Sequence, residues 1–323
     1  MRPALKAGLL PVWRDRDTLQ IGIDPRRAIA LTGMAGAAGL LGLLDGSRDR
    51  AQLAEAAREL GIQVPAVDRV LALLAAGEAL HDLPAGTRDG VPPARRRRLA
   101  AELATAALAH GDGDGGARTL ARRQAAWVQV RGTGRAGLCL ASLLAAAGIG
   151  RVTTTGLVSA RGRACPRRSG PRGQPAGPGT RPDLAVLAGP QQPEAAAGLM
   201  RDAVPHLAAS AAEAIGTVGP LVLPGRSACL RCLDAARAER DPAWPLILAQ
   251  QAGRQPDTPA CDVTLATAVA AQAAGQALAF IDRGEAASAV INGTLELFLP
   301  DWQWQRRTWR PHPRCGCGRP GSS

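Results

Sequence analysis

A glycine-rich turn between two apolar runs of different period constrains the fold of this chain more than any other feature. Trp127-Val-Gln-Val130 has the pattern of a buried strand, and Gly132-Thr-Gly-Arg-Ala-Gly137 follows it at once. Leu138–Ala147 then carries apolar residues at helical spacing, and Arg151–Thr155 is a second strand candidate. A strand, a glycine turn, a helix and a second strand make up one unit of a Rossmann-like sheet. We therefore predict an α/β fold built around this unit.

Each glycine of the turn has its own task in a nucleotide-binding unit. Gly132 permits the tight turn, Gly134 lets a phosphate approach the backbone, and Gly137 lets the helix pack closely on the strand. The helix that follows presents free N–H groups and the positive end of its dipole. Gly132, Gly134, Arg135 and Gly137 are therefore the candidate cofactor-binding residues.

The acidic residue that would hold the ribose of a nucleotide is missing from the sequence. Such an acid stands at the end of the second strand of the unit, where this chain has Gly156. No Asp or Glu occurs between Arg151 and Pro182. The sequence therefore argues against binding of NAD or ATP, and close packing of strand and helix explains the glycines equally well.

Two cysteine pairs, Cys229-Leu-Arg-Cys232 and Cys315-Gly-Cys317, predict a metal site. Two paired thiolates brought together form a tetrahedral site that suits Zn²⁺, and Gly316 eases the bend of the second pair. Four thiolates leave no open position for water, so the zinc would be structural. The alternatives are two unligated thiol pairs, a redox Cys-x-x-Cys, and a ligand set in which His312 replaces one cysteine.

Candidate catalytic groups are scarce. Cys261 precedes a long Ala-rich helix predicted over Val263–Ile281, and it is a candidate thioester nucleophile. No histidine lies near it in the sequence to activate it, and Asp262 is well placed to cap the helix. Because no Ser/His/Asp arrangement or carboxylate pair stands out either, we predict no catalytic residue.

The 323 residues suit two domains joined by a linker. We predict a small domain over residues 1–87, a linker with a helix over 88–117, and the Rossmann-like domain over 118–323. Residues 159–182 of the second domain are dense in Arg, Gly and Pro and have almost no apolar anchor, so we predict a disordered loop there. Near the end of the chain, Thr294–Leu299 and Gln303–Trp309 alternate as a closing antiparallel hairpin.

The first domain is predicted to be a small winged-helix-like α+β unit. Thr18–Ile23 and Arg27–Thr32 are short extended runs on either side of a turn. Three helices follow: one rich in Leu and Gly, one capped by Asp49, and one that begins at Pro65.

The formal net charge of +12 comes almost wholly from arginine, since Lys6 is the one lysine. The densest basic stretches, Arg95–Arg98 and Arg161–Arg181, have no interleaved aromatic residues, which argues against binding of single-stranded nucleic acid. Leu31–Leu44 is apolar but broken by glycines and too short to span a bilayer, and residues 1–12 lack a signal-peptide pattern. We predict a cytoplasmic protein with reduced thiols and with no nucleic-acid or membrane partner.

The chain resembles one known family over most of its length. Val218–Asp234, with its run Leu-Pro-Gly-Arg-Ser-Ala-Cys-Leu-Arg-Cys, resembles the ThiF-type proteins of azole-peptide (TOMM, bacteriocin) biosynthesis. So do Asp241–Pro245 and the ending His312–Cys317, and so do the opening Arg2–Lys6 and Leu19–Pro25. These proteins are the cyclodehydratase-associated, leader-peptide-binding members of the ubiquitin-activating-like superfamily.

The resemblance implies both a fold and a role. The fold is a Rossmann-like ThiF-type domain with a mixed sheet and a C-terminal hairpin, behind a peptide-recognition domain. The leader of a ribosomal precursor peptide would add as a strand to an exposed edge, either Thr18–Ile23 or Arg27–Thr32. The C-terminal domain would dock a YcaO-type cyclodehydratase, which closes rings on Cys, Ser or Thr with ATP. A homodimer is also implied.

The sequence departs from active members of that superfamily, which adenylate a carboxylate. Gly156 replaces the ribose-binding acid, and there is no lysine after Lys6. We therefore expect a leader-binding partner without adenylation activity. The alternative is an active ThiF-type adenylyltransferase that activates a peptide carboxylate. Two other functions are disfavoured. An NAD-dependent oxidoreductase would need the ribose acid and a Tyr-Lys pair, which this sequence lacks. A winged-helix DNA binder would need a basic stripe, and the sequence has none there.

Overall fold

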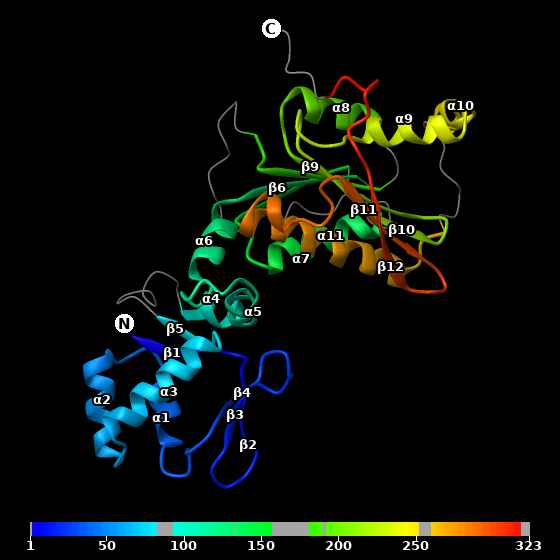
Figure 1. Ribbon diagram of the computed structural model, residues 1–323. Coiled ribbons are helices and arrows are strands. Elements are labelled where there is room, and N and C mark those ends of the chain that lie inside the picture. The colour runs from blue at the N-terminus through cyan, green and yellow to red at the C-terminus, as the bar shows by residue number, and fades with distance from the viewer. Residues whose placement is uncertain are drawn as a thin grey trace. The chain divides into compact units, whose positions relative to one another are not determined.

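The protein, studied as a computed structural model, divides into two compact units, Met1–Ala121 and Arg122–Ser323 (Figure 1). The structure describes residues 2–82, 93–132, 134–156, 181–189, 192–251 and 260–317. The loop predicted over residues 159–182 lies almost wholly outside the described residues. Each unit is described by itself below.

Two small sheets form the β part of the first unit. The strands are β1 (Pro3–Leu5), β2 (Pro11–Trp13), β3 (Leu19–Ile21), β4 (Ile29–Leu31) and β5 (Leu80–Asp82). β1 pairs with β5, while β2, β3 and β4 form an antiparallel sheet in that order. The two extended runs expected from the sequence are β3 and β4, and the structure adds β1, β2 and β5.

The order of the strands decides which edges are free. β3 is the central strand, paired on both sides, so the prediction that Thr18–Ile23 offers an exposed edge is wrong. The reason is β2, a strand of three residues that is too short for its period to be recognised in the sequence. The free edges of this sheet are therefore β2 and β4.

Pro11 weakens one of these edges. The Leu10 carbonyl accepts from the Gly22 N–H at 2.9 Å, and the Arg14 N–H donates to the Thr18 carbonyl at 2.9 Å. Because backbone groups alternate in direction along an edge strand, those of Pro11 point away from β3, and a proline has no N–H to donate there. β4 contains no proline, so it is the better edge for an added strand.

Three helices cover the sheets of the first unit: α1 (Gly39–Leu43), α2 (Arg50–Glu59) and α3 (Val64–Ala76). Asp49 caps α2 as predicted, since its side chain accepts from the Gln52 N–H at 2.9 Å and Gln52 returns a bond to the Asp49 N–H. Pro65 is the second residue of α3 rather than the first, a position that needs no N–H. The apolar faces meet in one core, which includes Ile21, Leu31, Leu53, Val67, Val70 and Leu74.

Three more helices follow in the chain: α4 (Pro93–Arg98), α5 (Ala100–His110) and α6 (Ala117–Ala125). Gly111 ends α5 with a positive φ of 67°, which a glycine adopts without strain. The Asp114 side chain then accepts from the N–H groups of Gly116 and Arg118, at 3.0 and 2.9 Å, and so starts α6. The glycine-rich segment between α5 and α6 is therefore a tight connection held by one carboxylate.

A seven-stranded mixed sheet forms the centre of the second unit. Its strands are β6 (Trp127–Gly132), β7 (Arg151–Thr155), β8 (Leu184–Ala188), β9 (His206–Ala212), β10 (Ile215–Val222), β11 (Gly293–Phe298) and β12 (Gln303–Thr308). The order is β12-β11-β10-β9-β8-β6-β7, with parallel pairing from β9 to β7 and antiparallel pairing from β9 to β12. The predicted mixed sheet and closing hairpin are both confirmed.

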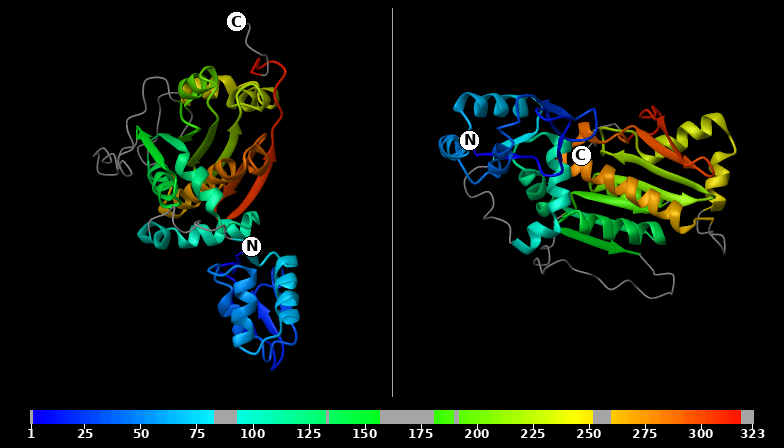
Figure 2. Two further views of the ribbon diagram at one scale, coloured as in Figure 1. Left: turned by 90° about the vertical axis from the view of Figure 1, so that its left-hand side faces the viewer. Right: turned by 90° about the horizontal axis from the view of Figure 1, so that it is seen from below.

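Helices cover both faces of this sheet (Figures 1 and 2). They are α7 (Arg135–Ala146), α8 (Pro193–Arg201), α9 (Leu230–Arg240), α10 (Trp244–Gln251) and α11 (Val263–Arg283), with the 3₁₀ turn η1 (Glu285–Ala287). Leu184 and Val186 of β8 pack into the core formed with α7 and α11, while Ala185 and Leu187 pack against α8. A strand buried on both faces is apolar throughout, as β8 is.

α11 is, by length and apolar composition, the one helix in the described part of the chain that could cross a membrane. Val269, Ala273 and Ala277 line the face that lies in the core of the unit, and the helix packs against α7, β9 and β10 (Figure 2). The core helix of a folded domain satisfies the same length criterion. Its packing therefore accounts for its composition without a bilayer.

Candidate functional site

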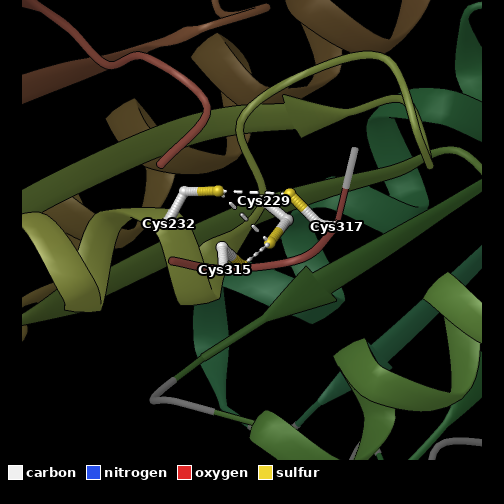
Figure 3. Close-up of side chains that lie close together, drawn as sticks. All are labelled: Cys229, Cys232, Cys315 and Cys317. Carbon is white, nitrogen blue, oxygen red and sulfur yellow. Dashed lines mark hydrogen bonds between the residues drawn. The ribbon is translucent and has the colours of Figure 1, made fainter. Parts of the chain in front are cut away.

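Four cysteine side chains converge at one place in the second unit (Figure 3). Cys229 is the residue before α9 and Cys232 lies in the first turn of that helix. Cys315 and Cys317 come from the segment after β12, where Gly316 has a φ of 71°. A glycine takes this left-handed conformation easily, so the chain can turn between the two sulfur atoms.

The sulfur atoms are close enough to share one ion. All four Sγ atoms lie within 4.8 Å of one another. The Sγ–Sγ distances are 3.8 Å from Cys229 to Cys232, 3.5 Å from Cys229 to Cys315 and 3.3 Å from Cys232 to Cys317. Sulfur atoms about 2.3 Å from a tetrahedral metal are roughly 3.8 Å apart. The set could therefore hold a metal ion, and the gathering of both pairs favours this over a lone redox pair.

Burial affects the four thiols unequally. It raises the pKa of Cys229 to about 11 and also raises the pKa of Cys317. For Cys232 burial acts in the same direction, but hydrogen bonds from the backbone of His312 and Cys229 outweigh it and lower the pKa. A cation among the sulfur atoms would supply the charge that the other thiols need to ionise.

The idea that His312 replaces a cysteine ligand is wrong. Its Nε2 lies 2.9 Å from a carboxylate oxygen of Glu239, and its Nδ1 accepts from the Arg314 N–H at 3.2 Å. The His312 backbone N–H instead donates to Cys232 Sγ at 3.3 Å. Both ring nitrogens are therefore engaged elsewhere, and His312 contacts the sulfur cluster through its backbone N–H alone. Residues that surround metal ligands commonly donate to them in this way.

The glycine turn has the geometry of a close-packed strand–helix junction. Gly132 has a φ of 143°, and a Cβ atom there would lie 1.6 Å from the Ala188 carbonyl oxygen. Gly137 is buried in the first turns of α7. Gly134 precedes α7 with a φ of 93°, and a Cβ atom there would meet nothing within 4 Å. Gly132 is thus required by packing, and Gly134 borders open space in front of a helix start.

Arg135, the first residue of α7, is exposed beside that open space. Its charge also acts on Cys261 and Asp262, so the starts of α7 and α11 lie close together. Burial raises the pKa of Cys261 even though Arg135 opposes the change, which disfavours the thiolate that a nucleophile requires. Asp262 caps α11 as predicted, since it accepts from the Leu265 N–H at 2.7 Å.

The position of the missing ribose acid can be located directly. β6 and β7 run parallel with Arg131 opposite Thr155, so the next residues, Gly132 and Gly156, are neighbours. A Cβ atom on Gly156 would lie 3.3 Å from the Gly132 carbonyl oxygen. The residue beside Gly132 at the end of β7 is therefore a glycine, which has no side chain to bind the sugar of a nucleotide.

A cavity of about 190 Å³ lies between α9 and the strands β8, β9 and β10. Its polar lining includes Gln192, Ser210, Thr217, Asp234, Arg237 and Thr294. Asp234 and Arg237 form an ion pair of 3.3 Å, and the Trp244 indole N–H donates to Asp234 at 3.2 Å. The sequence did not indicate this cavity because its walls come from segments far apart in the chain.

The comparisons with known proteins bear on the fold. No family model and no curated protein matches the sequence. Among solved structures, E. coli MccB with AMPCPP and MccA matches with a TM-score of 0.64 and 13% identity, over 99% of this chain and 100% of that one. The heterocyclase TruD matches with a TM-score of 0.65 and 18% identity, over 98% of this chain but 43% of TruD.

The chain has the fold of MccB and TruD. A heterocyclase in complex with substrate and cofactor matches in the same way, with a TM-score of 0.63 and 14% identity, over 95% of this chain and 38% of that one. The MccB likeness covers both units in full, so the small first unit is part of the shared architecture. The fold expected from the resemblance to ThiF-type proteins is confirmed, and at these identities the likeness concerns the fold alone.

Proposed function

We propose that this chain binds a ribosomal precursor peptide through its first unit and presents it to a YcaO-type cyclodehydratase, without adenylating the peptide itself. The observation that carries the proposal is the register of β6 and β7, which sets Gly156 beside Gly132. MccB has been solved with ATP, and this chain has its fold but no carboxylate at the position that would hold the ribose. Recognition of a peptide is the role that remains.

The edge of β4 supports peptide binding. In β3 the backbone groups of Thr18 and Gly22 point toward β2, so those of Leu19 and Ile21 point toward β4. Their partners in β4 are residues 31 and 29, which leaves the N–H and carbonyl of Ala30 on the free side. A peptide that adds here as a strand would bond to the Ala30 backbone.

α3 lies beside this edge and would form the other wall of the peptide site. The Arg69 guanidinium donates to the Thr32 carbonyl at 2.8 Å, and Gly77 is so close to the Ile29 side chain that a Cβ atom would lie 2.3 Å from it. The helix is thus held at the two ends of β4. A strand docked between them would exchange main-chain bonds with β4 and side-chain contacts with α3.

The heterocyclases that the chain matches suggest the chemistry of its partner. The chain spans less than half of TruD and of the second heterocyclase. We propose that a YcaO-type cyclodehydratase carries out the cyclisation. Holding both the peptide and the cyclodehydratase would raise the local concentration of substrate, which needs no chemistry from this chain. A cytoplasmic location and a homodimer belong to the same proposal.

We also propose that Cys229, Cys232, Cys315 and Cys317 bind Zn²⁺ as a structural site. The sulfur distances support it, and four thiolates leave the ion no place for a substrate or water. The ion would join the start of α9 to the segment after β12. It would thereby hold the last residues of the fold against Val222 and Trp309, which pack in the same small cluster.

A titration of the full chain with synthetic peptides tests the peptide role. The peptides are the leader segments of short precursor peptides encoded next to the gene for this chain. Ala30→Pro removes the outward N–H and should weaken binding at least about tenfold, since a main-chain bond is lost and the approach is blocked. Ala30→Val keeps the N–H and should bind as the wild type does. Equal binding by all three proteins would refute strand addition at β4.

A second measurement separates the non-catalytic role from the adenylating alternative. The full chain is incubated with ATP, labelled pyrophosphate and the same precursor peptide. Absence of exchange, in a preparation that binds the peptide, is the expected result. Peptide-dependent exchange would establish adenylation and overturn this part of the proposal.

A further inference from the structure

Lys6, the one lysine of the chain, is buried in the first unit with 3% of its surface exposed. Among the described residues its ammonium group makes no hydrogen bond and no ion pair. The ammonium nitrogen is not one of the fully buried polar atoms without a partner, so it is accessible from the cavity that Lys6 lines, where water or a ligand can bond to it. Burial lowers the pKa of Lys6, with the Glu78 carboxylate acting in the opposite direction.

Lys6 lines a cavity of about 560 Å³ in the first unit. The cavity lies where β4 begins and α3 ends, since Arg26 and Arg27 precede β4 and Gly77 and Glu78 follow α3. It therefore lies at one end of the edge on which a peptide strand would add. A side chain from that end of an added strand would lie nearest to the cavity.

The charges around the cavity are not all available to a ligand. Asp24 and Arg26 bind each other through two hydrogen bonds of 2.9 and 2.7 Å, so both are already paired. Arg27 donates one N–H to the Leu108 carbonyl at 2.9 Å and has further N–H groups to offer. Glu78 is exposed and hydrated. The cations that an incoming group would meet are Lys6 and Arg27.

We propose that this cavity binds the carboxylate of an Asp or Glu side chain in the peptide that adds to β4. The proposal rests on the proposed peptide-binding function and assigns that peptide an acidic position. The carboxylate would accept hydrogen bonds from the Lys6 ammonium and from Arg27, as charge-assisted bonds of this type do. Because the Glu78 carboxylate competes for the same cations, it would lower the affinity of the cavity for the peptide carboxylate.

The experiment uses the full chain and a displayed library of random twelve-residue peptides as the probe. The wild type should enrich strand-forming peptides with Asp or Glu at one fixed position. A synthetic peptide from the enriched set should lose about 10- to 100-fold in affinity when that acid is changed to its amide. Lys6→Met, which fills the same space without charge, should lose a similar factor toward the acidic peptide and bind the amide peptide as the wild type does.

Two further variants keep the test decisive. If Lys6→Met does not fold, Arg27→Gln should show a smaller loss that is likewise specific to the acidic peptide. Glu78→Gln should tighten binding of the acidic peptide, because it removes the competing carboxylate. Inorganic phosphate alone, added as a probe, should not stabilise the chain against heat; stabilisation that depends on Lys6 would identify a site for a free anion and overturn the proposal.

The outcomes separate this inference from the proposed function. Enrichment of peptides that lack a fixed acid, or unchanged affinity in the Lys6 and Arg27 variants, would refute the acidic position and leave strand addition intact. Failure to enrich any peptide would contradict the proposed function, and the inference would fall with it.

Discussion

Arg123 of α6 and Asp282 of α11 form a buried bidentate ion pair. Arg123 Nε lies 2.9 Å and Nη2 lies 2.6 Å from the two carboxylate oxygens, and the side chains are 8% and 2% exposed. A further N–H of Arg123 donates to the Ala147 carbonyl at 3.1 Å. The pair therefore links the helix that enters the second unit to the end of its core helix.

Asp282→Ala should lower the free energy of unfolding by about 3–5 kcal/mol, because it leaves the Arg123 charge buried without its partner. Chemical denaturation of the full chain measures the change. The matched control is Glu285→Gln, which breaks the exposed Arg226–Glu285 pair and should cost about 0–1 kcal/mol. Similar losses in the two variants would show that burial does not set the strength of the Arg123 pair.

The chain should contain one zinc ion, released by a strong chelator or by the variant Cys232→Ser. Release should lower the melting temperature, because the start of α9 and the segment after β12 lose their common anchor. Metal analysis and thermal unfolding measure both effects. Cys139→Ser, at a cysteine outside the sulfur cluster, should keep the metal in full. A metal-free wild type of unchanged stability would exclude the structural site.

Metal affinity should fall as the pH is lowered. The ligands must ionise, and burial raises the pKa of Cys229 to about 11, so protons compete with the metal over the whole range below that value. Proton release on metal addition, measured calorimetrically in buffers of different ionisation enthalpy, checks this. The competition is measurable between roughly pH 6 and pH 8, and a metal affinity that does not change over this range would argue against thiolate ligands.

Gly132→Ala should destabilise the second unit far more than Gly134→Ala does. A Cβ at position 132 would lie 1.6 Å from a backbone oxygen, whereas at position 134 it would enter open space. We expect a loss of at least about 3 kcal/mol for Gly132→Ala and of about 1–2 kcal/mol for Gly134→Ala, the latter from its positive φ alone. Equal losses, seen by urea denaturation, would contradict the packing role of Gly132.

Asp114 should make the first unit sensitive to acid. Burial alone would raise its pKa, but the N–H groups of Arg118 and Gly116 and the Arg118 guanidinium outweigh burial and lower it. Its contribution to stability is therefore complete above the ordinary carboxyl pKa of about 3.9 and is lost as the pH falls through the lower value of the folded state. Asp114→Asn should flatten the stability profile below about pH 4, where the wild type declines.

Much of the second unit could be predicted from the sequence. The strand before Gly132 and the helix after it have distinct periods, and β8 is apolar on both faces because helices cover both. The four clustered cysteines are recognisable from their spacing in the sequence. The cavity beside Arg237 was not, because its walls come from segments that only the completed sheet brings together.

The first unit shows where sequence patterns fail. Strands of three residues, such as β2 and β5, contain too few positions to show an alternating period. The sequence therefore does not indicate β2, and it leaves the runs that form β3 and β4 as alternative edges, of which only β4 is one. The sequence distinguishes Lys6 only as the one lysine of the chain, because its burial at a cavity depends on the packing of segments distant in sequence.

Pro11 makes the two edges of the β2-β3-β4 sheet unequal in their capacity to pair with another strand. On the β2 side the Pro11 position offers no N–H to a neighbouring strand, which disfavours pairing of two copies of the protein through β2. The opposite edge, β4, contains no proline and accepts an added strand more readily. One imino acid in a three-residue strand thus lowers the risk that the sheet acts as a template for aggregation.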